Sequence, residues 1–513
     1  MIEIAFLVEI QVTPPDGGAA SWLYLADTAL KPFGPHDPDR PNQAYDPRVK
    51  DAGNVVRGID LDNLDGDLGG GVIAISNNDG VLTAYRSHQF GQFAIYRGTV
   101  GAAFADYDLL LSGLCGTPEF GRSSSRPDRL LVPVFDPRAD LEKDIQETLY
   151  AGTNAGGGSG YEGTSGDLKD RPKPVALGNL TKANVPAIWA NAEDLVAQVS
   201  DGGFEALSAI YNGGGDANQT LAGDLTGAVF DNATPGDAEY VTDLARGYVK
   251  FGSRPVGAVT FDLKGSTQGM YFEDAPALIQ RVLENAGITS LSPGILATVA
   301  PEPVGVWLNE PASVGEVVAY LARSIGAVVL PDRMGVWQLI QVAPPTDAPV
   351  ITFEADDLVV NDTNADPLAT PTWRVTVNYA RNYSVMTGSD LQGSVEGTER
   401  EGFLAQEWRT AIVEDTTIKD RWPGAVERTL NTGLVNEADA QALATRLLDL
   451  YGPRTDGSAR EVVEAQVPMT DATLALEVGQ TVRLADGVDR NFIVTRIAPT
   501  RPRRHLLSLE LFG

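Results

Sequence analysis

The acidic segment Asp60–Asp67 comes closest in this sequence to a pattern with known chemistry. It carries four aspartates around an asparagine and a glycine (DLDNLDGD), and carboxylates at such spacing wrap calcium in loop sites. Two positions depart from that pattern, because Leu64 stands where an oxygen ligand is expected and Gly71 replaces the bidentate glutamate. The preferred interpretation is a polar turn between two strands, and an irregular calcium site is the alternative.

The histidines and the cysteine stand singly in the chain. His36, His88 and His505 have no second histidine at metal-ligand spacing, and a lone histidine is usually structural. Cys115 has no CxxC partner and lies among glycine and leucine at the expected end of a strand. We expect a packed, inert thiol there. A single cysteine also excludes an intramolecular disulfide framework and a cysteine-rich metal site.

Catalytic motifs are absent from the sequence or out of context. Gly158–Gly163 (GSGYEG) matches the G-x-G-x-x-G fingerprint, but no helix pattern follows it, and this fingerprint holds a phosphate only at the start of a helix. No G-x-S-x-G elbow, Walker loop or H-E-x-x-H occurs, and nothing selects one acid pair among the 69 Asp and Glu residues. We therefore expect no enzymatic activity, no catalytic residue, no cofactor and no metal.

The chain is strongly acidic. Its 39 Lys and Arg against 69 Asp and Glu give a net charge of −30, which argues against a dedicated nucleic-acid-binding surface. One basic cluster lies near the C-terminus, and its members are Arg490, Arg496, Arg501, Arg503 and Arg504. It is interpreted either as solvated strand ends or as a contact with an acidic neighbouring subunit.

Length and composition indicate several mainly β domains. A chain of 513 residues corresponds to about three or four domains. Its 54 Gly and 32 Pro favour many turns and short strands. The first residues predict a strand rather than a signal peptide, because no basic residue precedes the apolar run, so we expect synthesis and folding in the cytoplasm. The expected fold is mainly β with α+β parts and several domains: two β-barrel or sandwich tube-like domains, with α+β domains inserted between them.

Residues 1–150 predict an N-terminal β-rich tube-like domain. Apolar runs separated by turn residues indicate strands at 2–12, 22–26, 71–76, 93–96, 108–114 and 130–135. A Gly-rich linker loop is expected at 151–170. A second β-rich domain follows at 171–265, with strands at 173–178, 204–211, 248–251 and 256–262.

Residues 266–350 predict an α+β domain of two helices and a hairpin. Helical spacing covers 274–286. Ser313 and Glu316 form a capping box for a second helix, which Gly326 ends. Strands at 327–330 and 336–342 form the hairpin.

Residues 351–513 predict a C-terminal β-rich tube-like domain with helices. Apolar and polar residues alternate over 372–379, which indicates a half-buried strand. Helices are expected at 399–413 and 436–451. The remaining strands are expected at 461–467, 474–478, 480–484, 492–497 and 506–511.

Several stretches together resemble tail-tip hub proteins of long-tailed phages and prophages of proteobacteria. In the first half these are WLYLADT at 22–28, YDPRV at 45–49, ISNNDG at 75–80, YAGTN at 150–154, GDLKDRPKP at 166–174 and SDGG at 200–203. In the second half they are WRVTVNYARN at 373–382, FLAQEWR at 403–409, the expected helix at 436–451 and LEVGQTVRL at 476–484. Agreement with the family is poor at about 212–245.

The resemblance implies an assembly role similar to that of the baseplate hub of contractile phage tails. It implies a ring, usually a homotrimer, whose two tube-like domains per chain present pseudo-sixfold symmetry to a hexameric distal tail protein. The central fibre or tail-tip protein would attach below, and the tape measure protein is a further expected partner. Genome DNA would pass through without specific binding, and the chain would lie in the virion at the distal end of the tail.

Two other functions remain as alternatives. The distal tail ring protein belongs to the same class, but one tube-like domain fits 513 residues less easily than two. A β-sandwich glycan-binding protein or glycosidase belongs to a different class. Its missing feature is a clustered acid pair beside an aromatic platform.

Overall fold

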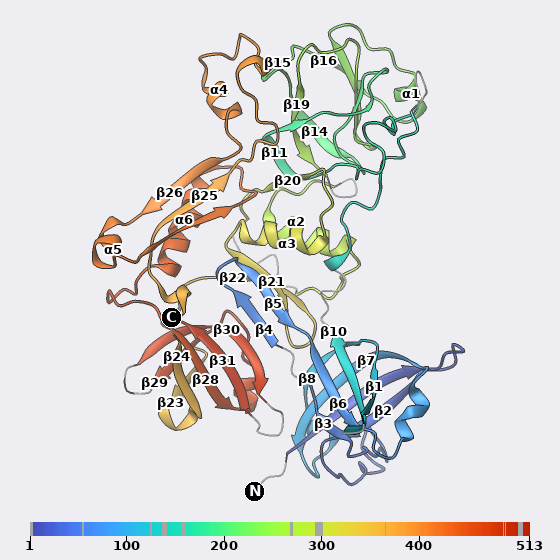
Figure 1. The fold of residues 1–513 in the computed structure, drawn as a ribbon, viewed down its shortest axis with the longest axis vertical. Coiled ribbons are helices and arrows are strands. Elements are labelled where there is room, and N and C mark those ends of the chain that lie inside the picture. The colour runs from blue at the N-terminus through green and yellow to red at the C-terminus, as the bar shows by residue number, and fades with distance from the viewer. Residues whose placement is uncertain are drawn as a thin grey trace.

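The structure, a computed structural model, describes residues 4–53, 56–123, 126–135, 141–154, 160–266, 270–292, 301–364, 366–485, 487, 489–500 and 506–513. Two large sheets, one from the N-terminal and one from the C-terminal part of the chain, lie side by side at one end of the molecule (Figure 1). A smaller β unit lies at the other end, and helices lie between (Figure 1). The expected mainly β, multidomain fold with α+β parts is confirmed.

The first sheet follows the order β2-β1-β7-β8-β10-β6-β3, with β9 paired to β10. On β7, alternating residues such as Phe93 and Ile95 are buried, so that strand turns one face to the core. The chain just before β3 also bonds to β2, through Ala26 N–H to Asp46 C=O (2.8 Å). The strands are β1 (Ile4–Thr13), β2 (Ser21–Ala26), β3 (Val49–Asp51), β6 (Gly71–Ser76), β7 (Gln89–Thr99), β8 (Asp108–Cys115), β9 (Glu119–Ser123) and β10 (Arg126–Phe135).

The second sheet follows the order β23-β29-β30-β31-β28-β24. Its strands are β23 (Ile351–Glu354), β24 (Val360–Asn364), β28 (Val462–Pro468), β29 (Thr481–Ala485), β30 (Arg490–Thr500) and β31 (Leu506–Phe512). A hairpin from the N-terminal part, β4 (Val56–Asp60) and β5 (Asp65–Gly69), completes this sheet by pairing with β30. Buried side chains of both sheets belong to one continuous apolar core.

The smaller β unit packs two five-stranded sheets, of orders β15-β14-β19-β11-β20 and β12-β13-β18-β17-β16. Phe251 and Phe261, one from each sheet, stack with ring centroids 6.4 Å apart. The elements are β11 (Val175–Pro186), β12 (Ile188–Asn191), β13 (Val196–Gln198), β14 (Phe204–Asn212), β15 (Gly215–Asp216), β16 (Thr220–Asp224), α1 (Ala228–Asp231), β17 (Glu239–Asp243), β18 (Tyr248–Phe251), β19 (Val259–Gly265) and β20 (Gly305–Leu308). The four strands expected in this region are confirmed.

Helices α2 (Ala275–Asn285) and α3 (Val314–Arg323) lie between the β units (Figure 1). The expected capping box is confirmed, because Ser313 accepts from Glu316 N–H while the Glu316 carboxylate accepts from Ser313 N–H. The expected hairpin follows as β21 (Ala327–Pro331) and β22 (Trp337–Gln341).

An α/β unit is inserted between β24 and β28. Its sheet has the order β26-β25-β27, and the long helix α6 packs on it. The elements are β25 (Thr372–Tyr379), α4 (Glu399–Leu404), β26 (Arg409–Glu414), α5 (Thr416–Arg421), β27 (Val426–Asn431) and α6 (Glu437–Tyr451). The alternating strand at 372–379 and the helix at 436–451 are confirmed.

Two expected elements in the C-terminal part are wrong. The helix expected at 399–413 ends at Leu404, because Arg409–Glu414 pairs antiparallel with β25 and places Ala411 inward. The strand expected at 474–478 is replaced by the short helix α7 (Asp471–Leu474), which the Thr470 hydroxyl caps, and by a loop. Leu476 is buried without pairing in a sheet, so burial rather than strand structure explains its apolar character.

Candidate assembly site: two equivalent sheets and their junction

The two large sheets share one order of six strands. Without β2, the first sheet reads β1-β7-β8-β10-β6-β3, and the second reads β23-β29-β30-β31-β28-β24. Positions are counted across each sheet, so that β1 and β23 are first and β3 and β24 are sixth. Followed along the chain, the strands of both sheets then occupy the first, sixth, fifth, second, third and fourth positions. The sequence alone does not show this equivalence, because the two halves share no recognisable repeat.

Smaller features repeat with the strands. A short helical turn follows the fifth-position strand in each sheet: the 3-10 turn η1 (Val81–Tyr85) after β6, and α7 after β28. In each sheet, the connection between the strands at the sixth and fifth positions forms a separate structure. It is the β4–β5 hairpin between β3 and β6 in the first sheet, and the α/β unit between β24 and β28 in the second. Neighbouring strands from the second to the sixth position are antiparallel in both sheets. The first strand differs, because β1 is antiparallel to β7 whereas β23 is parallel to β29.

Three arginines bond at the junction of the sheets, and one of them, Arg97, joins the first sheet directly to the C-terminal part. The Arg97 guanidinium of the first sheet is buried and donates to the Met469 carbonyl oxygen of the second part at 2.8 Å. Arg333, on the β21–β22 turn, donates to the Leu109 carbonyl oxygen of β8 at 2.7 Å. Arg57 on the hairpin forms an ion pair with Glu477. Burial raises the pKa of Glu477, and Arg57 opposes that shift.

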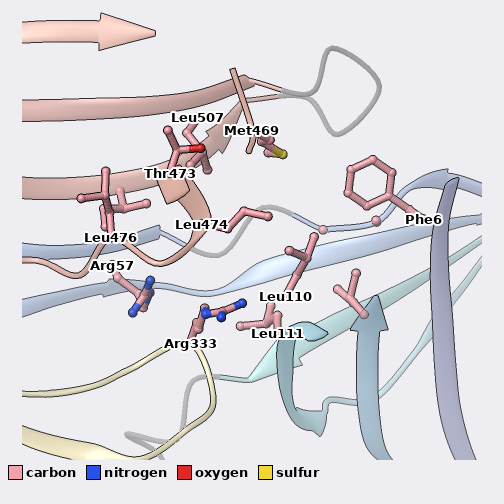
Figure 2. A pocket seen from close by; sticks show the side chains of 14 residues that line it. Phe6, Arg57, Leu110, Leu111, Arg333, Met469, Thr473, Leu474, Leu476 and Leu507 are labelled. Carbon is pink, nitrogen blue, oxygen red and sulfur yellow. The ribbon is translucent and has the colours of Figure 1, made fainter. Parts of the chain in front are cut away.

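An apolar cavity of about 70 Å³ lies at this junction (Figure 2). Figure 2 shows Arg57 and Arg333 on one side of it and Phe6 on the other. Side chains from both sheets line it, among them Phe6, Leu110, Met469, Leu474 and Leu507. The lining is mainly apolar, and its polar side chains are those of Arg57, Arg333 and Thr473.

A buried ion pair fastens a long loop to the first sheet. Glu9 on β1 is 3% exposed and accepts from Arg40 Nε and Nη2, both at 2.8 Å. The Tyr45 hydroxyl donates to the same carboxylate. The Arg40 guanidinium also lies 4.4 Å from the centre of the Phe104 ring. The loop that carries Arg40 and Tyr45 connects β2 to β3, so these contacts hold that loop against β1.

The acidic segment 60–67 forms the tip of the β4–β5 hairpin. The expected turn between two strands is confirmed, because residues 61–64 connect β4 to β5. The carboxylates are engaged by protein donors: Asp60 accepts from Asp62 N–H at 2.9 Å, Asp62 from Arg428 at 2.9 Å, and Asp65 from Gly66 N–H at 2.7 Å. Among the residues that the structure describes, no three His, Cys, Asp or Glu side chains come together closely enough to hold a metal ion.

The single histidines and the glycine motif occupy ordinary positions. His36 is exposed, and His88 packs against the Tyr85 ring, while His505 lies outside the described residues. Gly158 and Ser159 of the G-x-G-x-x-G match also lie outside them. The described remainder enters turns rather than a helix, and Tyr161 packs on the Phe230 ring. The match therefore does not form a dinucleotide site.

The basic cluster is described at two of its members. Arg490 donates to Glu461 at 2.6 Å, and Arg496 lies 3.6 Å from Asp67 on the hairpin. Both therefore pair within the chain. Arg501, Arg503 and Arg504 lie outside the described residues.

Cys115 is buried at the end of β8, and burial raises the pKa of its thiol from 9.0 to about 12. The thiolate fraction at pH 8 should therefore fall about a thousandfold. We expect the native chain to react with iodoacetamide far more slowly than the chain unfolded in guanidinium. Mass spectrometry of the alkylated protein measures both rates, and equal rates would contradict a packed thiol.

Sequence reasoning did not identify the junction arginines. Arg97 carries a signal in retrospect, because it continues the inward alternation of Phe93 and Ile95 on β7. A charged residue at an inward position indicates a buried polar partner. Arg57 and Arg333 carry no comparable signal, since their partners come from distant parts of the chain.

Among the described residues, no helix is both long and apolar enough to cross a membrane.

Comparisons with known proteins give structural similarity without detectable sequence similarity. No protein-family profile and no curated protein sequence matches the chain. Solved structures with nearly full coverage include the 43 kDa tail protein of prophage MuSo2 from Shewanella oneidensis (TM-score 0.41, 9% identity, 99% of this chain and 98% of that one). A tail protein from Neisseria meningitidis (0.41, 10%, 99% and 96%) and a prophage tail protein from Listeria monocytogenes (0.35, 8%, 98% and 94%) are also similar.

Proposed function

We propose that this chain is a structural protein of a long-tailed phage tail and, more narrowly, the hub of the tail tip. The observation that carries this proposal is the order of six strands that the two large sheets share. A chain with two equivalent sheets offers two equivalent surfaces, and three copies around a threefold axis offer six. That number suits a hexameric distal tail ring, whereas a ring protein needs one such sheet per chain.

The proposed partners are those that the family resemblance implies. The chain forms a homotrimer, contacts the distal tail protein on one side and holds the central fibre or tail-tip protein on the other. The tape measure protein would end near the same ring. The basic residues at 501–504 are proposed to meet an acidic surface of a neighbouring subunit, which the charge of this chain makes favourable.

The acidic composition supports a channel that DNA crosses without binding. Carboxylates repel phosphates, whereas clustered Lys and Arg bind them with salt-dependent strength. A trimer would carry three times the charge of −30. Duplex DNA should therefore pass through a column of immobilised chain unretained even at low salt. Retention there would contradict the proposed channel lining.

Immunogold electron microscopy of intact particles tests the proposed location. An antibody raised to this chain should label only the distal end of the tail. The mass of the detached tip complex then separates three copies from six. Label on the capsid, or free in the lysate with the tip unlabelled, would contradict the hub and favour the glycan-acting alternative.

A further inference from the structure

The β4–β5 hairpin leaves the first sheet without contributing to it. Strands β3 and β6, on either side of the excursion, pair directly with each other, and Asp51 lies opposite Ala74. The hairpin instead pairs with the second sheet, where Gly58 lies opposite Arg496. Strand β29 occupies only the first part of the same edge of β30, from Arg490 to Ile493. The hairpin therefore lies on the part of that edge which β29 does not reach.

Polar contacts anchor the hairpin along its whole length. Near its start, Arg57 pairs with Glu477, which precedes β29. At its tip, Asp62 accepts from Arg428 at 2.9 Å. The buried Tyr451 hydroxyl of α6 donates to the Leu61 carbonyl oxygen at 2.5 Å. These contacts reach the second sheet, β27 and α6, which are all parts of the C-terminal half.

Apolar contacts secure the same hairpin. Ile59, Leu61 and Leu64 are each at most 5% exposed, although the short hairpin that carries them does not pair with the first sheet. Gly66 lies against β21, where a Cβ atom would approach Leu330 Cδ2 to 2.4 Å and the Val329 carbonyl oxygen to 3.1 Å. The hairpin thus packs closely against β21 as well.

We propose that the Val56–Gly69 hairpin is a strap that fixes the relative orientation of the two large sheets. The apolar cavity beside it marks the seam, which is the line along which the two sheets separate when the hairpin is detached from the second sheet. Other described contacts at the seam include the hydrogen bond from Arg97 to the Met469 carbonyl oxygen and the apolar side chains that line the cavity. The pocket leaves part of the seam without packed side chains, and its lining lacks the dispersion contacts of a filled core there. The strap does not depend on the proposed phage role.

Excision of the hairpin tests the strap directly. Removing 54–69 leaves Ala52, Gly53 and Gly70 between the end of β3 and the start of β6, and the paired residues of β3 and β6 lie outside the deleted segment. Spin labels are placed on the full chain at the exposed positions Gln89 of β7 and Glu464 of β28, in a Cys115→Ser background. Electron paramagnetic resonance then measures the distribution of distances between the sheets, and circular dichroism monitors folding.

We expect a narrow distribution with the hairpin present and a broadened, shifted one after excision, with the strand signal retained. A folded, excised chain with an unchanged narrow distribution would overturn the proposal, because the seam would then hold without the strap.

Two single substitutions test the strap if the chain without the hairpin does not fold. Gly66→Ala places a methyl against Leu330, whereas Gly70→Ala, just outside the hairpin, meets nothing nearer than the Val134 carbonyl oxygen at 3.5 Å. Broadening in Gly66→Ala with a narrow distribution in Gly70→Ala supports the strap. Equally narrow distributions in the two variants overturn it.

Discussion

Replacing Gly247 by alanine should strongly destabilise the sheet β12-β13-β18-β17-β16. Gly247 has φ +80°, and a Cβ atom there would lie 1.7 Å from the Ser200 carbonyl oxygen. That oxygen belongs to the backbone and cannot rotate away. The Gly247 carbonyl oxygen also accepts from Val199 N–H at 2.9 Å, so displacement would break the contact that joins the β17–β18 turn to the chain after β13. We expect a loss of several kcal/mol in the free energy of unfolding.

Gly202 provides the matched control for this substitution. It has a similar φ of +77°, but a Cβ atom there would meet nothing within 4 Å. Gly202→Ala should therefore cost only the conformational term, about 1–2 kcal/mol. Hydrogen exchange of β13 and β18 and thermal melts monitored by circular dichroism measure both variants. Equal losses would show that backbone conformation, and not the contact with Ser200, sets the effect.

Replacing Glu9 by alanine should destabilise the first sheet by about 3–5 kcal/mol, because it leaves the Arg40 charge and the Tyr45 hydroxyl without their carboxylate partner. The Glu9 carboxylate is nearly fully buried, so water cannot replace it. Glu9→Gln should cost less, since it keeps the shape and part of the hydrogen bonding. Urea unfolding measures each free energy.

The Asp79–Arg48 pair is the control for Glu9. Asp79 accepts two hydrogen bonds from Arg48, but its side chain is 49% exposed. Asp79→Ala should therefore cost at most about 1 kcal/mol, and less in high salt. The loss in Glu9→Ala should change little with salt. A loss as small and as salt-sensitive as that of Asp79→Ala would show that Glu9 is not an anchor.

Sequence patterns were sufficient where neighbours along the chain decide the structure. Ser313 and Glu316 cap α3 through bonds that span three residues. The alternation over 372–379 marks β25 because one face of that strand packs under α6. The pattern failed at 409–413, where strand pairing with β25 prevailed over apparent helical spacing.

Only part of the candidate site could be predicted from the sequence. The expected polar turn at 60–67 is confirmed, but nothing in those residues shows that the hairpin leaves its own sheet to pair with β30, more than 400 residues further along the chain. The junction arginines Arg57 and Arg333 likewise bond to groups whose proximity depends on the folded chain.

The sequence by itself determined a mainly β chain with an acidic surface, its capped helices and most of its strands, because periodicity, capping and composition act locally. Only the tertiary structure decided that the first and last sheets share one strand order. Strand order depends on which edges meet after folding, and two sequences can satisfy the same order with different side chains. The position of the hairpin was decided in the same way, by burial of Leu61 and Leu64 against parts of the chain that are remote in sequence.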